Sequence, residues 1–211
     1  MLLEKIKEST LVDLLTIVTP FLLIMGVMNK VGIYTSKYVD ASWFITIFTP
    51  LDFMVSDLTI YLVFASALIY LEKVIFKSNE NMKMELFRAN IMLFSAYLGM
   101  FLLFFLTHKS LSQLIQFYFF MAFSLNGFAM IMLSKGAGKI IGFGLIVLIP
   151  FITGAQHANK IVDKKLPIVE LEDGKEWYLL DKHSDQLILI NTQDNKNEFK
   201  IVEMKEIKIL K

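Results

Sequence analysis

The 211-residue sequence contains no cysteine, which excludes disulfides, thiolate metal sites and cysteine nucleophiles. Charged residues are also scarce: they make up 19% of the chain, against roughly 25% in an ordinary soluble domain. The formal net charge is only +1, so the chain as a whole gives no electrostatic argument for direct nucleic-acid binding. These shortages exclude several classes of protein and point to none by themselves.

Catalytic signatures are missing as well. The run GAGK at 136–139 is not a phosphate-binding loop, because that loop needs glycine where Leu133 stands and Ser or Thr where Ile140 stands. The histidines are scattered, and there is no G-x-S-x-G elbow. An intramembrane enzyme would need a pair of reactive groups at depth, and no convincing pair is present. We therefore expect no enzymatic activity, no cofactor and no metal site.

The chain does contain long apolar runs. Five stretches approach the roughly 20 residues, within a range of about 17–25, that a membrane-spanning helix needs. They cover residues 11–28, 51–71, 89–107, 113–133 and 140–155. The sequence therefore predicts an α-helical multi-pass membrane bundle of four to five spans, occupying residues 1–160, with the lipid bilayer as its first partner.

The tail from residue 161 to 211 has a different pattern. Short runs of branched and aromatic residues, such as QLILIN and EFKIVE, are separated by turn residues. This is typical of β-hairpins. We expect a small all-β, SH3-like domain in which Trp177 and Leu179 face one side and Tyr178 and Leu180 the other. So small a unit is marginal alone, so we expect it to pack on the membrane part, on a sister subunit or on a partner.

The distribution of basic residues bears on orientation, because cytoplasmic loops are enriched in Lys and Arg. The loop 72–88 and the triplet Lys160, Lys164 and Lys165 are the two strongest clusters. Five full spans place these clusters on opposite sides, whereas a non-crossing fifth stretch places both inside. We expect a multi-pass protein of the cell inner membrane with a cytoplasmic C-terminal domain.

Polar residues inside apolar stretches are the candidate functional groups, since a charge at membrane depth is costly. Asp57 is the strongest candidate: it either lines a cavity for a cation or proton, or is an interfacial carboxylate in the first turn of its helix. Asp13 and Asp52 lie nearer segment ends, where the interfacial interpretation is stronger. Asn126, in the middle of the fourth stretch, is expected to bond to a neighbouring helix rather than to line a pore.

Small residues four apart allow helices to approach closely. Ser95 and Gly99 form one such pair, and Gly138 and Gly142 form another. We interpret both as helix-packing positions, within one chain or between copies of a homo-oligomer. In the tail, the aromatic residues Trp177 and Tyr178 are candidates for binding a partner.

Two functions fit these observations. The first is a non-catalytic membrane sensor or scaffold that oligomerises and couples the membrane to a cytoplasmic protein partner. The alternative is a small oligomeric ion channel or pore that is gated by the C-terminal β domain. In the channel, Asp57 and Asn126 would line the pore.

The overall architecture, a short multi-pass bundle followed by a tiny β domain, resembles the membrane subunits of bacterial antiphage defence systems of the Kiwa type. The resemblance lies in the architecture alone and involves no residue motif. It implies a membrane protein that senses infection and works with a DNA-binding cytoplasmic partner. It transfers no functional residue to this chain.

Overall fold

The computed structural model describes residues 11–55, 58–76, 81–106, 112–171, 175–192, 197–206 and 209–210. The chain forms two compact units. The first comprises residues 1–18 and 57–149, and the second comprises residues 19–56 and 150–211. The second unit therefore groups the C-terminal tail with residues 19–56 and with the end of the helix that precedes the tail.

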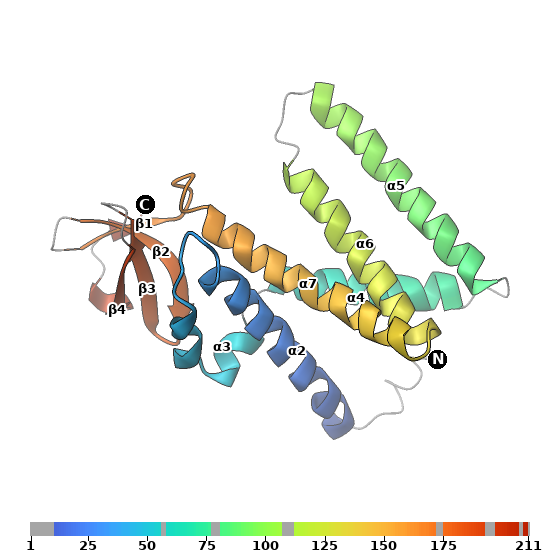
Figure 1. Ribbon diagram of the computed structural model, residues 1–211, viewed down its shortest axis with the longest axis horizontal. Helices are drawn as coiled ribbons and strands as arrows, with labels where there is room; N and C mark the ends of the chain where they lie inside the picture. Colours follow the sequence, from blue (N-terminus) through green and yellow to red (C-terminus); the bar gives the residue numbers. More distant parts are fainter. Residues whose placement is uncertain are drawn as a thin grey trace. The chain divides into compact units, whose positions relative to one another are not determined.

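The helical part is built in chain order from α-helices and short 3-10 or π segments. They are α2 (Leu11–Tyr34), η1 (Ser42–Ile47), α3 (Pro50–Met54), α4 (Leu58–Tyr70), the π-helical η2 (Leu71–Phe76), α5 (Met82–Leu106), α6 (Ser112–Leu133) and α7 (Ala137–Asn159) (Figure 1). The C-terminal strands are β1 (Ile168–Glu170), β2 (Glu176–His183), β3 (Gln186–Asn191), β4 (Glu198–Glu203) and β5 (Ile209–Leu210), with the 3-10 turn η4 (Met204–Glu206).

The second apolar stretch, 51–71, contains two helices in the structure. A helix that starts near Thr59 is what the interfacial interpretation of Asp57 implied. Thr49 accepts a hydrogen bond from the Asp52 backbone N–H, and the Asp52 side chain accepts one from the Thr49 backbone N–H. This capping box, with Pro50 in the first turn, starts a separate short helix. The longer helix α4 begins only at Leu58.

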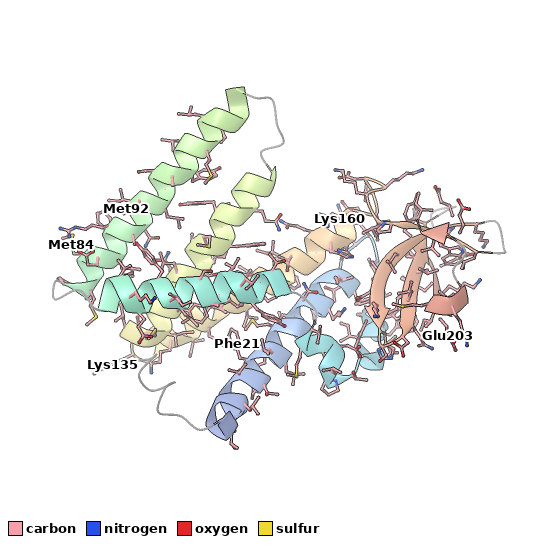
Figure 2. All side chains as sticks on the ribbon, turned by 180° about the vertical axis from the view of Figure 1, so that it is seen from behind. Phe21, Met84, Met92, Lys135, Lys160 and Glu203 are labelled. Atoms are coloured by element: carbon pink, nitrogen blue, oxygen red, sulfur yellow. The ribbon has the colours of Figure 1, made fainter. Side chains whose placement is uncertain are left out.

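The first unit contains α4, α5, α6 and the N-terminal part of α7. Phe64 of α4 meets Phe128 of α6 edge to face, with ring centroids 5.7 Å apart. Helices α6 and α7 approach closely where a Cβ added to Gly142 would lie 2.6 Å from the Gly127 carbonyl oxygen. Much of the surface of α5 is apolar and exposed, and includes Met84 and Met92 (Figure 2).

The second unit contains the sheet, whose strand order is β4-β3-β2-β1-β5 with antiparallel neighbours. The expected alternation in β2 is confirmed. Tyr178 and Leu180 belong to a core shared with the helices, whereas Trp177 and Leu179 pack on the other side. The sheet therefore buries apolar side chains on both faces, as the small size of the domain required.

The core between sheet and helices is largely aromatic. Tyr34, at the end of α2, stacks on Phe44 of η1 with centroids 5.6 Å apart and contacts Phe48 at the same separation. Buried residues of α7 and β3 complete the cluster, among them Ala158, Ile188 and Ile190. The tail thus packs on the connector after α2 and on the end of α7.

The expected fold class is confirmed at a coarse level: a mostly helical region is followed by an antiparallel sheet. Among the described residues, α7 is the one helix long and apolar enough by composition to cross a membrane. Two shorter apolar helical stretches, Val18–Tyr34 and Tyr118–Leu133, also occur.

Candidate functional site

A buried ion pair in the second unit joins α2 to the sheet. The Lys30 ammonium lies 2.6 and 2.7 Å from the two carboxylate oxygens of Asp181 in β2. Lys30 is only 4% exposed, although lysine is almost never fully buried without a partner. Its Nζ also lies 4.6 Å from the ring centroid of Phe48, a cation–π contact. The pair therefore lies against apolar surface, where water solvates the charges poorly and each charge needs the other as its countercharge.

Asp181 reaches this position because β2 is irregular there. Leu179 pairs with Leu189 and Asp181 pairs with Ile188, so one extra residue stands in β2 between the two pairs. Such a bulge redirects the side chains that follow it. Lys30 belongs to α2 and therefore reaches Asp181 from the helix side of the interface. The bulge therefore places the Asp181 carboxylate in an otherwise apolar interface.

Two further groups surround the ion pair. The Tyr34 hydroxyl donates a hydrogen bond of 3.0 Å to Oδ2 of Asp181. On α7, Nε2 of His157 lies 2.9 Å from the Leu180 carbonyl oxygen. Because a carbonyl only accepts, that nitrogen carries the proton. The residues before and at the bulge are thus bonded to both α2 and α7, and we call this set of contacts the helix–sheet latch.

The two helices that hold the latch pack closely and run in the same direction. The Asn29 side-chain amide donates to the Pro150 carbonyl oxygen at 3.3 Å and to Thr153 Oγ1 at 3.2 Å. A Cβ on Gly154 would collide with the Asn29 carbonyl oxygen, and one on Gly32 would collide with the backbone of α7 at Phe151. Contacts advance along both helices together, so α2 and α7 are parallel and both end beside the sheet.

A second polar link joins α3 to the turn between β2 and β3. Asp52 accepts hydrogen bonds from the Thr49 hydroxyl at 2.6 Å and from the Ser184 backbone N–H at 3.1 Å. His183 Nδ1 lies 2.9 Å from Asp52 Oδ2. Partial burial of Asp52 would raise its pKa, but the hydrogen bonds from Thr49, Ser184 and His183 lower the pKa to about 2.

This lowered pKa predicts a pH dependence. The folded pKa of Asp52 lies below its ordinary value of 3.8, so its contribution to stability is present above that ordinary value and is lost as the pH falls. We expect the difference in unfolding midpoint between the wild type and Asp52→Asn to shrink from about pH 5 towards about pH 2. The fluorescence of buried Trp177 reports the unfolding. A difference that is constant with pH would contradict this prediction.

The polar contacts of this site join secondary-structure elements of the second unit. Its charged groups are paired with one another or with the backbone. Among the described residues, no group of three His, Asp or Glu side chains is placed to hold a metal ion. The latch bonds β2 to the ends of two helices.

Three polar residues were expected to matter at membrane depth. Asp57 lies outside the described residues, and Asp13 lies in α2 with its side chain outside the described part. The Asn126 side chain exchanges hydrogen bonds of 2.8 and 3.1 Å with Asn90 of α5 and donates to the Ala122 carbonyl oxygen at 2.8 Å. The amide of Asn126 is thus used between α5 and α6, the use favoured from the sequence.

The four helix-packing candidates differ in their surroundings. Gly142 lies against α6, as described above. Gly138 lies against Ser134, in the connection between α6 and α7. Ser95 is exposed, and no described atom lies within 4 Å of a Cβ built on Gly99. That face of α5 is open within the described part of the first unit.

The two aromatic residues considered for partner binding are buried. Trp177 and Tyr178 are each 4% exposed, because β2 is a central strand with packed residues on both faces. The exposed aromatic residue of this unit is instead Trp43 of η1, which stacks on Phe44 with centroids 4.1 Å apart. Its position in a short apolar connector was visible in the sequence, but its link to the sheet was not.

Comparison with known proteins gives no relative: no family model, no curated protein and no solved structure matches the chain.

Proposed function

We propose that this chain is a multi-pass membrane protein that acts as a non-catalytic sensor or scaffold and transmits helix displacement to a small SH3-like β domain. The observation that carries the proposal is the buried Lys30–Asp181 pair, which fixes β2 to the end of α2. A loosely tethered domain would not require a buried charge pair. A domain that must follow two helices gains a defined orientation from it.

The parallel arrangement of α2 and α7 supports an odd number of crossings. If both helices cross in the same direction, the chain between them crosses an odd number of times, and α4 with η2, α5 and α6 supply three crossings. Five spans then separate the N-terminus from the sheet. We propose that the sheet lies on the cytoplasmic side, where Lys160, Lys164 and Lys165 directly follow α7.

Orientation is tested by a reporter fused after Lys211. A reporter active only in the cytoplasm should give signal, and one active only in the periplasm should not. The loop 72–88, with its own basic residues, then lies on the opposite side. A periplasmic signal after Lys211 would reverse the orientation and with it the proposed compartment of the partner.

The surface that would bind a cytoplasmic protein is proposed at β4, which is an edge strand. Ile201 in β4 and Trp43 in η1 are exposed, and Phe199 of β4 contacts the Trp43 ring edge to face at 6.4 Å between centroids. An added strand would pair with β4 and cover Ile201, the mode known as β-augmentation.

Capture experiments test this surface. Full-length tagged protein should retain a soluble partner, Ile201→Ser should lose it, and Val162→Ser should keep it, because Val162 is exposed but lies outside β4. Equal capture by both variants would remove β4 from the proposal. No capture by the wild type would count against the scaffold function.

The open face of α5 at Ser95 and Gly99 is where we propose that a second copy packs.

The channel alternative makes a different prediction at Asn126. We expect purified wild type and Asn126→Leu to show the same conductance in planar bilayers, namely none. The substitution should instead weaken the α5–α6 contact by about 1 kcal/mol, since it removes an interhelical hydrogen bond. A conductance that changes with Asn126→Leu would favour the pore.

On its architecture alone, we also propose a role in bacterial antiviral defence.

A further inference from the structure

The short helix α3 turns back towards the apolar part of α2. A Cβ built on Gly26 would collide with the Phe53 carbonyl oxygen, so the α3 backbone lies directly on α2 at that point. At about 1.5 Å per residue, Gly26 precedes Tyr34 by about 12 Å along the helix. Gly26 also lies within the apolar run 11–28. Figure 1 shows α3 beside α2. The connector therefore returns to the level of this apolar run instead of leading away from it.

The backbone of α3 is suited to an apolar environment. Pro50 has no N–H, the Asp52 N–H donates to Thr49 Oγ1, and the N–H groups of Phe53 and Val55 donate to the carbonyl oxygens of Thr49 and Leu51. Backbone groups at membrane depth must be satisfied within the protein. The one charge of the helix, Asp52, is turned towards Thr49 and the β2–β3 turn, as described above.

The exposed face of α3 carries two large apolar residues. Leu51 and Val55 are 68% and 70% exposed, and residues four apart share one face of a helix. Phe53 points elsewhere and contacts Phe48, with ring centroids 5.9 Å apart. The short helix is therefore amphipathic, with its polar group bound to the sheet and its apolar face uncovered at the level of Gly26.

We propose that α3 is an interfacial anchor whose apolar face, Leu51 and Val55, sits among the lipid acyl chains just below the headgroups. This inference rests on the proposed membrane insertion of α2, because the apolar run of α2 sets the depth of Gly26. The occupant of the face is the leaflet that borders the second unit. Through Asp52, the anchor also links lipid contact to the β2–β3 turn and hence to the sheet.

The absence of cysteine allows a clean test. A nitroxide spin label is attached to Val55→Cys, in protein reconstituted into phosphatidylcholine–phosphatidylglycerol liposomes, and its accessibility to oxygen and to a water-soluble nickel chelate is measured. Leu51→Cys is the second variant, and Trp177 fluorescence confirms that each variant is folded. Lys182→Cys, exposed in β2, serves as the aqueous control, and Val18→Cys, exposed in α2 near the middle of the apolar run 11–28, as the membrane control.

We expect the labels at positions 51 and 55 to favour oxygen over the nickel chelate several-fold, with a depth between those of the two controls. A preference for the nickel chelate equal to that at Lys182 would overturn the anchor. Shielding from both reagents would also overturn it, because protein would then cover the face. If the Val18 label is itself aqueous, the proposed membrane insertion fails. If it is deep while Val55 is aqueous, the anchor alone fails.

Discussion

Replacing Asp181 with asparagine is expected to lower the free energy of unfolding of the second unit by about 3–5 kcal/mol. The substitution keeps the size of the side chain but leaves the Lys30 ammonium buried without a countercharge, against the Phe48 ring. It also weakens the bond from the Tyr34 hydroxyl. Denaturant unfolding in detergent, followed by the fluorescence of buried Trp177 in a Trp43→Phe background, measures the change.

An exposed pair of similar length provides the matched control. Lys165 and Asp163 lie 2.7 Å apart, with side chains 68% and 57% exposed. Asp163→Asn is expected to cost less than about 1 kcal/mol, because water already solvates both charges. The double variant Lys30→Met with Asp181→Leu should recover most of the loss, since no charge then remains buried. Equal losses for Asp181→Asn and Asp163→Asn would show that burial does not govern the latch.

The latch illustrates what local sequence patterns leave out. Lys30 and Asp181 are 151 positions apart in the chain, and neither stands in a motif. In the sequence, Lys30 lies just after the first apolar stretch, and Asp181 is one of two acidic residues in β2. A pair of this kind becomes visible only when packing places the two segments together. The bulge that aims Asp181 depends on cross-strand register, which alternation alone does not specify.

The sheet was more predictable than the helices. Period-two alternation from Trp177 to Leu180 correctly assigned the two faces of β2, because side chains in a strand alternate where no bulge intervenes. Hydropathy alone does not register the capping box that divides the apolar run 51–71. Thr49 and Asp52, three residues apart and followed by apolar residues, were the available signal for a new helix start.

Small residues at spacing four do not mark the close contacts that α2 makes with α3 and α7. Gly26 and Gly32 are six residues apart, and Gly154 stands alone in α7. Each is nevertheless a point at which another backbone approaches too closely for a Cβ. Single glycines in apolar helices therefore marked the contacts of the second unit. The Ser95 and Gly99 pair, which matched the expected spacing, faces no described neighbour in the first unit.

Substituting Gly154 with alanine is expected to destabilise the second unit by about 1–3 kcal/mol or more. The new Cβ would collide with the Asn29 carbonyl oxygen, and main-chain atoms cannot rotate away as a flexible side chain does. To relieve the clash, α2 and α7 must separate, which also strains the Asn29 bonds to Pro150 and Thr153. The same Trp177 unfolding assay measures the loss.

Gly144, on the same helix, distinguishes helix propensity from packing. No described atom lies within 4 Å of a Cβ built on it, so Gly144→Ala should be neutral or stabilising by up to about 1 kcal/mol, the intrinsic preference of helices for alanine. Opposite signs at the two positions would show that the α2–α7 contact needs glycine at 154. Destabilisation of similar size at both positions would contradict the prediction. It would mean that the loss at Gly154 does not come from its close contact with α2.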